Sequence, residues 1–324
     1  MKLYYKECGA IERKLDLMES EILHQCSLCN GALLDVLDAD CNIAQCRCCG
    51  YVFDNPRPTL QELIGFYSRP RKYDSWLDEL VARDRLWQRR LSKLRPTKKN
   101  GSLLDVGTGI GQFLSLARGD YSEVYGTEVS STAVEIARQR YGLELFHGTV
   151  DDLAKTGKVF DNISLFHVLE HVPDPKALLT TCHSLLNPGG VLVVAVPNEV
   201  ASLRAVLRRI LVKGNLKKPG DRGALGLPRI RLDGSIGEIH LSHFTPKVLR
   251  HLVSSTGFSI LTSTLDPYYV RSGLARVRAE LYYMFCLSLR GLFGINVYDA
   301  ILVIARKKPS GGDEGQEARV PRRT

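Results

Sequence analysis

The stretch "LLDVGTGIGQFL", residues 103–114, decides the fold of this 324-residue chain. An apolar run ends at Asp105, and Gly107, Gly109 and Gly111 then alternate with other residues before a helical pattern begins. A glycine turn between a strand and a helix lets the backbone approach a ligand closely. The G-x-G-x-G spacing differs from a dinucleotide fingerprint, whose third glycine falls one residue later, so it favours a ligand without pyrophosphate. A tight turn that binds nothing is the alternative.

Acidic residues stand at or after the ends of three neighbouring apolar runs. We expect Asp105 to face a cationic group, such as the aminoacyl part of an adenosine ligand. Glu128 ends the second run, where an acid can accept hydrogen bonds from both ribose hydroxyls. Its alternative role is a charge at the N-terminus of the next helix. Asp151 and Asp152 follow the third run and either reach the adenine amino group or cap the helix after them.

From residue 102 to Pro197, strand patterns alternate with helical ones. This alternation predicts parallel βαβ units in an open sheet, and the near-continuous apolar strands predict helices on both faces. The alternation stops at the basic residues 199–240 and resumes with a helix capped by Thr245 and two strands, 259–265 and 299–307.

Four segments together resemble the motifs of class I S-adenosylmethionine-dependent methyltransferases: "LLDVGTGIGQFL", "YGTEVS", "FDNISLFHVLEHVPDP" and "LLNPGGVLVVAVPN". The resemblance implies an α/β, Rossmann-like fold whose seven-stranded, mostly parallel sheet ends in an antiparallel strand. It implies S-adenosyl-L-methionine as the cofactor. The residues that match cofactor-binding positions are Asp105, Gly107, Gly109, Gly111, Glu128, Val129, Asp151 and His167.

Two C-x-x-C pairs precede this domain, Cys26 with Cys29 and Cys46 with Cys49. Their separation suits tetrahedral Zn²⁺ held by thiolates, with reduced and unliganded cysteines as the alternative. Four thiolates leave no open position, so we expect the zinc to be structural rather than catalytic. Cys48 competes with Cys49 for the last position, but the two-residue spacer and the following glycine favour Cys49.

The four-cysteine ribbon is followed by the motif "PRPTLQEL", residues 56–63. This combination resembles a subgroup of the methyltransferases that acts on small molecules, including sugars and other metabolites of polysaccharide or natural-product pathways. The resemblance implies a small-molecule acceptor and leaves its identity open.

A histidine base is expected, because an oxygen or carbon acceptor loses a proton as it is methylated. The candidates are His167, His171, His240 and His243. We predict His171, on the side to which the methyl group should project, or His243, just before the helix that begins at Thr245. Packing or hydrogen bonding is the alternative role of each.

The predicted reaction is O- or C-methylation, rather than N-methylation, of a small-molecule or glycan- or lipid-linked acceptor. We expect residues 199–240 to form a mobile lid whose basic side chains suit an anionic acceptor. The chain lacks the Pro-Pro-Tyr-like motif and the cysteine pattern that mark DNA methyltransferases, so nucleic acid is not the expected acceptor. RNA stays an alternative because of the basic run at 204–222. Two further alternatives are a zinc-ribbon scaffold protein with a vestigial pocket and an NAD-dependent oxidoreductase.

The composition, 44% hydrophobic and 24% charged, is typical of a globular protein. The net charge of +9 either attracts anionic partners or is a solvated face. Without a long apolar run or an N-terminal leader pattern, we predict a cytoplasmic protein. The apolar segment 281–294 either rests on the inner face of a membrane or packs against the sheet or a second copy, and the oligomeric state stays open.

The predicted organisation follows these changes in composition. The segments are a helical segment at 1–24, the zinc ribbon at 25–58, a helical linker or cap at 59–100, the methyltransferase domain at 101–308 and a disordered tail at 309–324.

Overall fold

The computed structural model describes residues 19–94, 101–218, 220–232, 235 and 237–309. The predicted tail, apart from residue 309, lies outside the described residues, as does most of the predicted helical segment 1–24. The described end of that segment is not helical, because Ser20–Glu21 forms strand β1 and pairs antiparallel with β5 (Arg57–Pro58). An ion pair of 2.7 Å between Glu21 and Arg57 reinforces this short sheet.

A seven-stranded sheet forms the centre of the molecule, in the order β12-β13-β10-β9-β6-β7-β8. β13 runs antiparallel to both of its neighbours and the pairs from β10 to β8 are parallel, which confirms the predicted fold class. The chain order reverses at β6, which lies between β7 and β9, and ligands of such sheets bind at that point. The strands are β6 (Ser102–Val106), β7 (Glu123–Glu128), β8 (Phe146–His147), β9 (Phe160–Phe166), β10 (Leu186–Pro197), β12 (Phe258–Leu265) and β13 (Ala300–Lys307).

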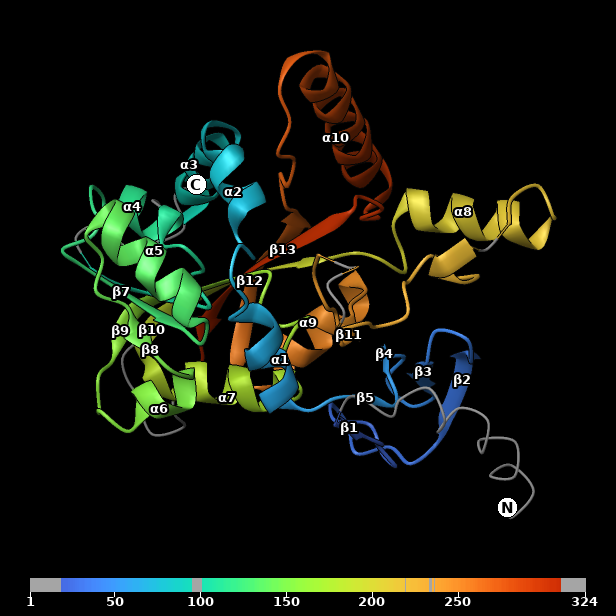
Figure 1. Cartoon of the computed structure of the whole chain (residues 1–324), viewed down its shortest axis with the longest axis horizontal. Coiled ribbons are helices and arrows are strands. Elements are labelled where there is room, and N and C mark those ends of the chain that lie inside the picture. The colour runs from blue at the N-terminus through green and yellow to red at the C-terminus, as the bar shows by residue number, and fades with distance from the viewer. Residues whose placement is uncertain (1–18, 95–100, 219, 233–234, 236, 310–324) are drawn as a thin grey trace, which may run out of the picture.

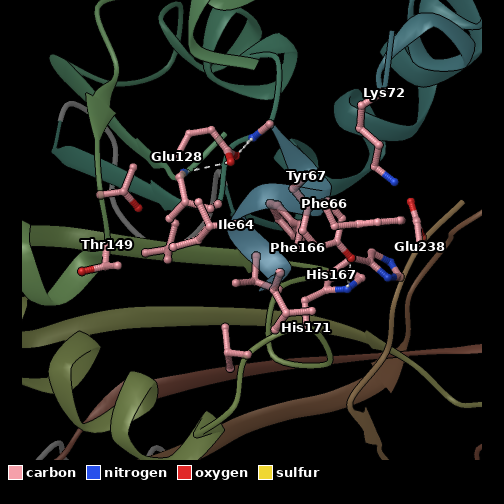
Figure 2. Close-up of a pocket in the computed structure, with 18 of the residues that line it drawn as sticks. Ile64, Phe66, Tyr67, Lys72, Glu128, Thr149, Phe166, His167, His171 and Glu238 are labelled. Atoms are coloured by element: carbon pink, nitrogen blue, oxygen red, sulfur yellow. Dashed lines mark hydrogen bonds between the residues drawn. The ribbon is translucent and has the colours of Figure 1, made fainter. Parts of the chain in front are cut away.

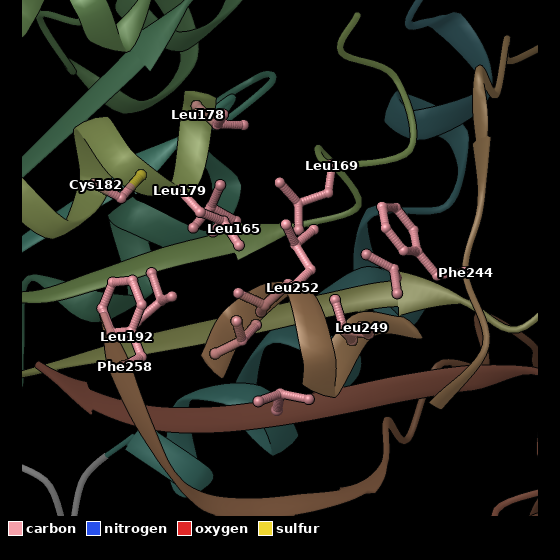
Figure 3. Packing of buried hydrophobic residues seen from close by; sticks show 14 of the residues in the cluster. Leu165, Leu169, Leu178, Leu179, Cys182, Leu192, Phe244, Leu249, Leu252 and Phe258 are labelled. Carbon is pink, nitrogen blue, oxygen red and sulfur yellow. The ribbon is translucent and has the colours of Figure 1, made fainter. Parts of the chain in front are cut away.

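Helices cover both faces of this sheet (Figure 1). On one face, leucines of α7 and α9 pack with strand residues such as Leu165, Leu192 and Phe258 (Figure 3). On the other face, Trp87, Phe113 and further apolar residues form a second buried cluster. The helices next to the sheet are α4 (Gln112–Ala117), α5 (Ser131–Tyr141), α6 (Val150–Ala154), α7 (Pro175–Leu185) and α9 (Pro246–Ser255).

Three helices that lie in the sequence between the ribbon and the seven-stranded sheet form a cap over the carboxyl ends of the central strands of that sheet. They are α1 (Leu60–Tyr67), α2 (Asp74–Asp78) and α3 (Leu80–Leu94). α1 starts where the Thr59 hydroxyl accepts a hydrogen bond from the Glu62 N–H. Arg90 of α3 forms a fully buried ion pair of 2.5 Å with Asp266, just after β12, and this pair ties the cap to the sheet.

The ribbon forms a separate antiparallel sheet in the order β11-β4-β3-β2. β2 (Leu34–Asp38), β3 (Ile43–Cys46) and β4 (Val52–Asp54) come from the predicted ribbon, whereas β11 (Ser242–His243) comes from just before α9. A strand from the part of the chain that carries the seven-stranded sheet therefore completes the ribbon sheet, so the two parts are joined by backbone pairing.

The insert predicted to be a lid contains α8 (Leu203–Lys213) and a short 3-10 helix, Gly220–Arg222. Figure 1 shows α8 and α10 (Gly273–Phe293) projecting from the body of the molecule, away from the sheet. Among the described residues, no helix is long and apolar enough to cross a membrane.

Candidate active site

A cavity of about 950 Å³ lies between the carboxyl ends of the central strands and the cap. Its size is in the upper part of the range for ligand pockets, about 300–1,000 Å³, so it can hold a nucleoside cofactor and a small acceptor together. Figure 2 shows Glu128 and Thr149 at one end and His171 and Glu238 at the other. The predicted site residues that line it are Gly107, Gly109, Glu128, Val129, Asp151, His167 and His171. Asp105, Gly111 and His243 do not line it.

The glycine turn has the backbone conformation that glycine permits. Gly107, Gly109 and Gly111 have φ values of 64°, 59° and 77°, in the left-handed region. A Cβ at Gly109 would lie 2.9 Å from the ring of Trp76, which lines the cavity beside it. A Cβ at Gly111 would instead meet Leu143 at 2.7 Å. Gly111 therefore packs within the turn and does not line the cavity, and its predicted contact with a cofactor stays a prediction.

Glu128 closes the other side of the turn. One carboxylate oxygen accepts the N–H of Gly109 at 2.8 Å, and the second accepts the N–H groups of Val129 and Ser130 at 2.9 Å each. The carboxylate is thereby aimed along the edge of the cavity, with lone pairs left for ligand hydroxyls. Burial raises the pKa of Glu128, and these three N–H groups oppose that rise.

The two aspartates after the third strand have separate roles. Asp152 forms a capping box with Thr149 at the start of α6. Asp151 lines the cavity, and one of its oxygens accepts a hydrogen bond of 2.5 Å from the Thr181 hydroxyl. The sequence left both roles open for the pair, and the structure assigns the cap to Asp152.

Asp105 lies beneath the turn rather than in the cavity. It is 3% exposed, and its carboxylate accepts a hydrogen bond of 2.6 Å from the Ser164 hydroxyl of β9. Burial raises the pKa of Asp105 to about 7, although the hydrogen bond from Ser164 acts against this. Asp105 does not line the cavity, and its predicted contact with a cationic ligand group stays a prediction.

His171, like His167, lines the cavity, and its Nε2 accepts no hydrogen bond from the described residues. Its Nδ1 lies 2.5 Å from the carbonyl oxygen of Ile239 and 2.8 Å from the hydroxyl of Tyr67. A carbonyl can only accept, so Nδ1 carries the proton of the neutral ring and Nε2 keeps its lone pair. Burial lowers the pKa of His171, which keeps the ring neutral near pH 7.

A buried cluster of charges surrounds this ring. Glu170 is completely buried, and its carboxylate accepts a hydrogen bond of 3.0 Å from Nδ1 of His167. His167 has a φ of 60°, which is strained for a residue with a Cβ. Although burial opposes its charged form, the nearby Asp266 carboxylate, 3.8 Å from Nε2, and the hydrogen bond to Glu170 raise the pKa of His167.

Ligand atoms of Glu170, His171 and His240 lie within 4.8 Å of one another, close enough to hold a metal ion. Nδ1 of His240 forms an ion pair of 3.0 Å with Glu199. Burial opposes the charged ring, but Glu199 and Glu238 raise the pKa of His240 well above its ordinary value. A protonated His240 ring balances these carboxylates.

His243, the other predicted base, has both ring nitrogens engaged outside the cavity. Nε2 lies 2.9 Å from Asp54 of the ribbon and Nδ1 lies 2.8 Å from Glu199. Burial disfavours the charged ring, yet these two carboxylates raise the pKa of His243 to about 9. The expected catalytic position is therefore not what the structure gives, and His243 instead links the ribbon to the sheet.

Several cavity residues escaped the sequence reasoning because they come from the cap or from the end of the insert. Arg83 is 8% exposed, its guanidinium lies 4.1 Å from the Trp76 ring, and its Nε has no hydrogen-bond partner among the described residues. Lys72 donates a hydrogen bond to the carbonyl of Gly237, next to Glu238. The cluster of aromatic residues at 67–87 was the signal that could have pointed to this wall.

The four predicted zinc ligands come together in the ribbon. The Cys26 and Cys49 sulfurs are 3.6 Å apart and the Cys29 and Cys46 sulfurs 3.5 Å. Zinc–sulfur bonds of about 2.3 Å in a tetrahedron separate the sulfurs by about 3.8 Å, so the arrangement fits a structural zinc. Cys48 is exposed and is not part of the four-cysteine group.

Comparison with known proteins gives the family. A family model described as a methyltransferase domain matches residues 79–263, which is 185 of the 324 residues. The ubiquinone biosynthesis O-methyltransferase of Cereibacter sphaeroides is 36% identical over 102 residues, 30% of this chain and 41% of that protein. The protein of the same name from Coxiella burnetii is 32% identical over 109 residues, 32% of this chain and 46% of that protein. The chain spans less than half the length of these relatives.

Solved structures include a SAM-dependent methyltransferase from Archaeoglobus fulgidus, with 18% identity, a TM-score of 0.46, and coverage of 72% of this chain and 99% of that one. Another is an S-adenosylmethionine-dependent methyltransferase from Mesorhizobium loti, with 19% identity, a TM-score of 0.42, and coverage of 65% and 93%. Because the family model covers more than half of the chain, this protein belongs to the methyltransferase-domain family.

Proposed function

We propose that the chain methylates an oxygen or carbon atom of a small anionic acceptor and that His171 is the base. The observation that carries the proposal is that the glycine turn with Glu128 and the free nitrogen of His171 share one cavity. A cofactor end and a proton-accepting end in the same enclosed space are what an in-line transfer requires.

The cofactor end is formed by the turn and the strand ends beside it. S-adenosylmethionine supplies an electrophilic methyl group on a sulfonium. Gly107 and Gly109 let the backbone come close, and Glu128 accepts hydrogen bonds from ribose hydroxyls. Asp151 stands where it can accept from an adenine amino group, and Trp76 covers the turn from the cap side.

The proton-accepting end is built on His171. Its Nδ1–H is held by the Ile239 carbonyl, so Nε2 takes the proton that an acceptor hydroxyl or carbon loses during transfer. Tyr67 holds the ring from the cap, and Glu170, 3.9 Å from Nε2, stabilises the imidazolium that forms. Tyr67 is thus a positioning residue.

The acceptor is an anionic small molecule such as a nucleotide-linked sugar or a lipid-linked glycan. Cationic side chains of the cap, Arg69, Arg71, Lys72 and Arg83, line the cavity. Oxygen methylation is supported by the relatives named O-methyltransferases. The basic residues of α8, which kept RNA as an alternative, do not line the cavity. Gly237 and Glu238, at the end of the insert, do line the cavity. We therefore propose that this end of the insert, rather than α8, covers the acceptor.

The test combines cofactor binding with methyl transfer. We expect S-adenosylmethionine to bind in a calorimetric titration and tritium to pass from labelled cofactor to an acceptor in cell extracts. His171→Gln should keep the binding and lose the transfer. His251→Gln, at an exposed position on α9, is the matched control. Absence of cofactor binding would favour the scaffold alternative, and transfer that survives His171→Gln would remove this residue as the base.

A further inference from the structure

An apolar stripe runs along the solvent-facing side of α10. Leu274, Val277, Leu281, Met284 and Leu292 follow one another at spacings that place them on one helix face. Leu274 is 79% exposed, Leu281 66% and Leu292 77%. Phe285 and Phe293, also more than half exposed, widen the stripe.

The opposite side of α10 already packs on the body of the molecule. Cys286 is buried with Leu265 and Tyr298, and Tyr282 and Tyr283 pack against that cluster. The stripe is therefore a second apolar face, and none of the described residues covers it. A helix that is apolar on both sides is ordinarily covered by something else.

α8 adds a second exposed apolar face next to the first. No residue of α8 is buried, and Leu207 and Ile210, one turn apart, are 52% and 61% exposed. The Leu203 N–H donates to the Val297 carbonyl at 2.8 Å, which places the start of α8 beside the end of α10. In Figure 1, α10 extends toward the top and α8 toward the right from neighbouring parts of the molecule.

The charges around these faces are mostly positive. Residues 200–218 contain six basic residues and no acidic one. α10 contains a single acid, Glu280, which pairs with Arg276 at 2.8 Å. Arg271 and Arg278 are exposed near the stripe.

We propose that the exposed sides of α8 and α10, called here the α8–α10 face, dock on the surface of an anionic lipid bilayer. Apolar side chains would enter the headgroup region while lysines and arginines contact lipid phosphates, as in interfacial amphipathic helices. A second copy of the chain fits less well, because a two-fold interface brings the same patch together and would place these positive charges against one another.

The first residue of α10 also follows a cavity residue closely in the sequence. Tyr268 lines the cavity, and the chain from Tyr268 leads directly to Gly273, the first residue of α10. A protein docked through this face would meet an acceptor whose lipid tail remains in the bilayer. Only this step rests on the proposed function, because docking itself requires neither cofactor nor acceptor.

The experiment is co-sedimentation of the whole protein with phosphatidylcholine vesicles, with and without phosphatidylglycerol, in the absence of cofactor. We expect the protein to sediment with the anionic vesicles, to stay in solution with the neutral ones and to be released by salt. Replacing Leu281, Met284 and Leu292 together by Gln should abolish sedimentation. Replacing Arg209, Lys213 and Lys217 together by Gln should weaken it.

Matched controls separate docking from misfolding and from failure of the proposed function. Val81→Gln changes an apolar residue that is 70% exposed on α3, away from the face, and should leave sedimentation unchanged. Each variant should keep the wild-type melting temperature and cofactor titration. Equal sedimentation with both vesicles, or undiminished sedimentation of the triple Gln variant of α10, would overturn the proposal. A wild-type dimer that this variant converts to monomer, with no vesicle binding by either, would assign the face to a second copy.

Discussion

The hydroxyl of Tyr67, in the last turn of α1, lies 2.8 Å from Nδ1 of His171, which follows β9. The same hydroxyl accepts the N–H of Ile239 at 3.1 Å and lies 3.2 Å from its carbonyl oxygen. The cap, the central sheet and the end of the insert thus meet at one ring. The position of the proposed base depends on all three.

Replacing Tyr67 by Phe should lower the turnover number without changing cofactor affinity. The ring of His171 loses one of its two contacts at Nδ1, at a cost of about 1 kcal/mol, so we expect a decrease of roughly fivefold to tenfold. Steady-state kinetics and calorimetric titration measure the two quantities. Tyr282→Phe removes a hydroxyl that contacts Asp299 outside the cavity and is the matched control. Equal losses in both variants would mean that the effect is general destabilisation.

The rate should fall as the pH is lowered through the pKa of His171. Burial puts this pKa below the ordinary 6.5, and only the neutral ring can accept a proton, so the acidic limb of kcat should have its midpoint below pH 6.5. The limb should be absent from any residual activity of His171→Gln. A limb with its midpoint near pH 9 would point to a group such as His243 instead.

Replacing Asp105 by Asn should stabilise the cofactor-free protein increasingly as the pH rises from 4 to 7. The folded pKa of about 7 lies above the ordinary 3.8, so over this range the unfolded chain has lost a proton that the folded chain retains. The free energy of unfolding of the wild type therefore falls with each unit of rising pH, whereas that of Asp105→Asn, whose amide stays neutral, does not change for this reason. Melting temperatures across this range measure the effect, with the exposed Asp78→Asn as control. A difference between wild type and Asp105→Asn that does not change with pH would refute the assignment.

The fold and much of the cofactor end could be predicted because their determinants are local. The glycine spacing at 107–111 and the acid at the end of β7 can each be recognised from a short stretch of consecutive residues. The C-x-x-C pairs are likewise local, because each pair binds from one short turn. The prediction that residues 1–24 are helical is wrong at its described end, where pairing with Arg57–Pro58 overrides the local pattern.

The cap side of the cavity could not be predicted, because its contacts join segments far apart in the chain. Nothing in the sequence near Trp76 indicates that its ring lies against Gly109, and nothing near Arg90 indicates a buried pair with Asp266. Asp105 matched its motif position, but its burial against Ser164 depends on the pairing of β6 with β9. The position of a residue in a motif therefore predicted that it lies at or near the site, but not whether its side chain lines the cavity.

Removing the ribbon cysteines should release one zinc per chain. Cys26→Ser takes one thiolate from a four-sulfur site, so we expect the zinc to be lost and the melting temperature to fall. Cys48→Ser should retain the metal, since this exposed cysteine is outside the four-cysteine group. Elemental analysis of the purified proteins measures the zinc. Full zinc content in Cys26→Ser would exclude the proposed site.

Replacing His243 by Gln should destabilise the protein without removing the base. The wild-type ring stands between Asp54 and Glu199. Its loss leaves the buried Asp54 carboxylate without its cation, at a cost of about 3–5 kcal/mol, whereas Glu199 keeps its ion pair with His240. The folded pKa of about 9 exceeds the ordinary 6.5, so this stability is fully present below pH 6.5 and is lost as the pH rises through 9. Denaturant unfolding at pH 6 and pH 9 should show a gap between wild type and variant that narrows at the higher pH.

The activity per folded molecule distinguishes a role of His243 as the catalytic base from a role in linking the ribbon to the sheet. His243 lies outside the cavity, so the variant that folds should keep its turnover number at a temperature below its transition. His171→Gln should show the reverse behaviour, with normal unfolding above pH 7 and no turnover. If His243→Gln were as stable as wild type but inactive, the ring would have to reach the acceptor, and the link between ribbon and sheet would have to open for it to do so.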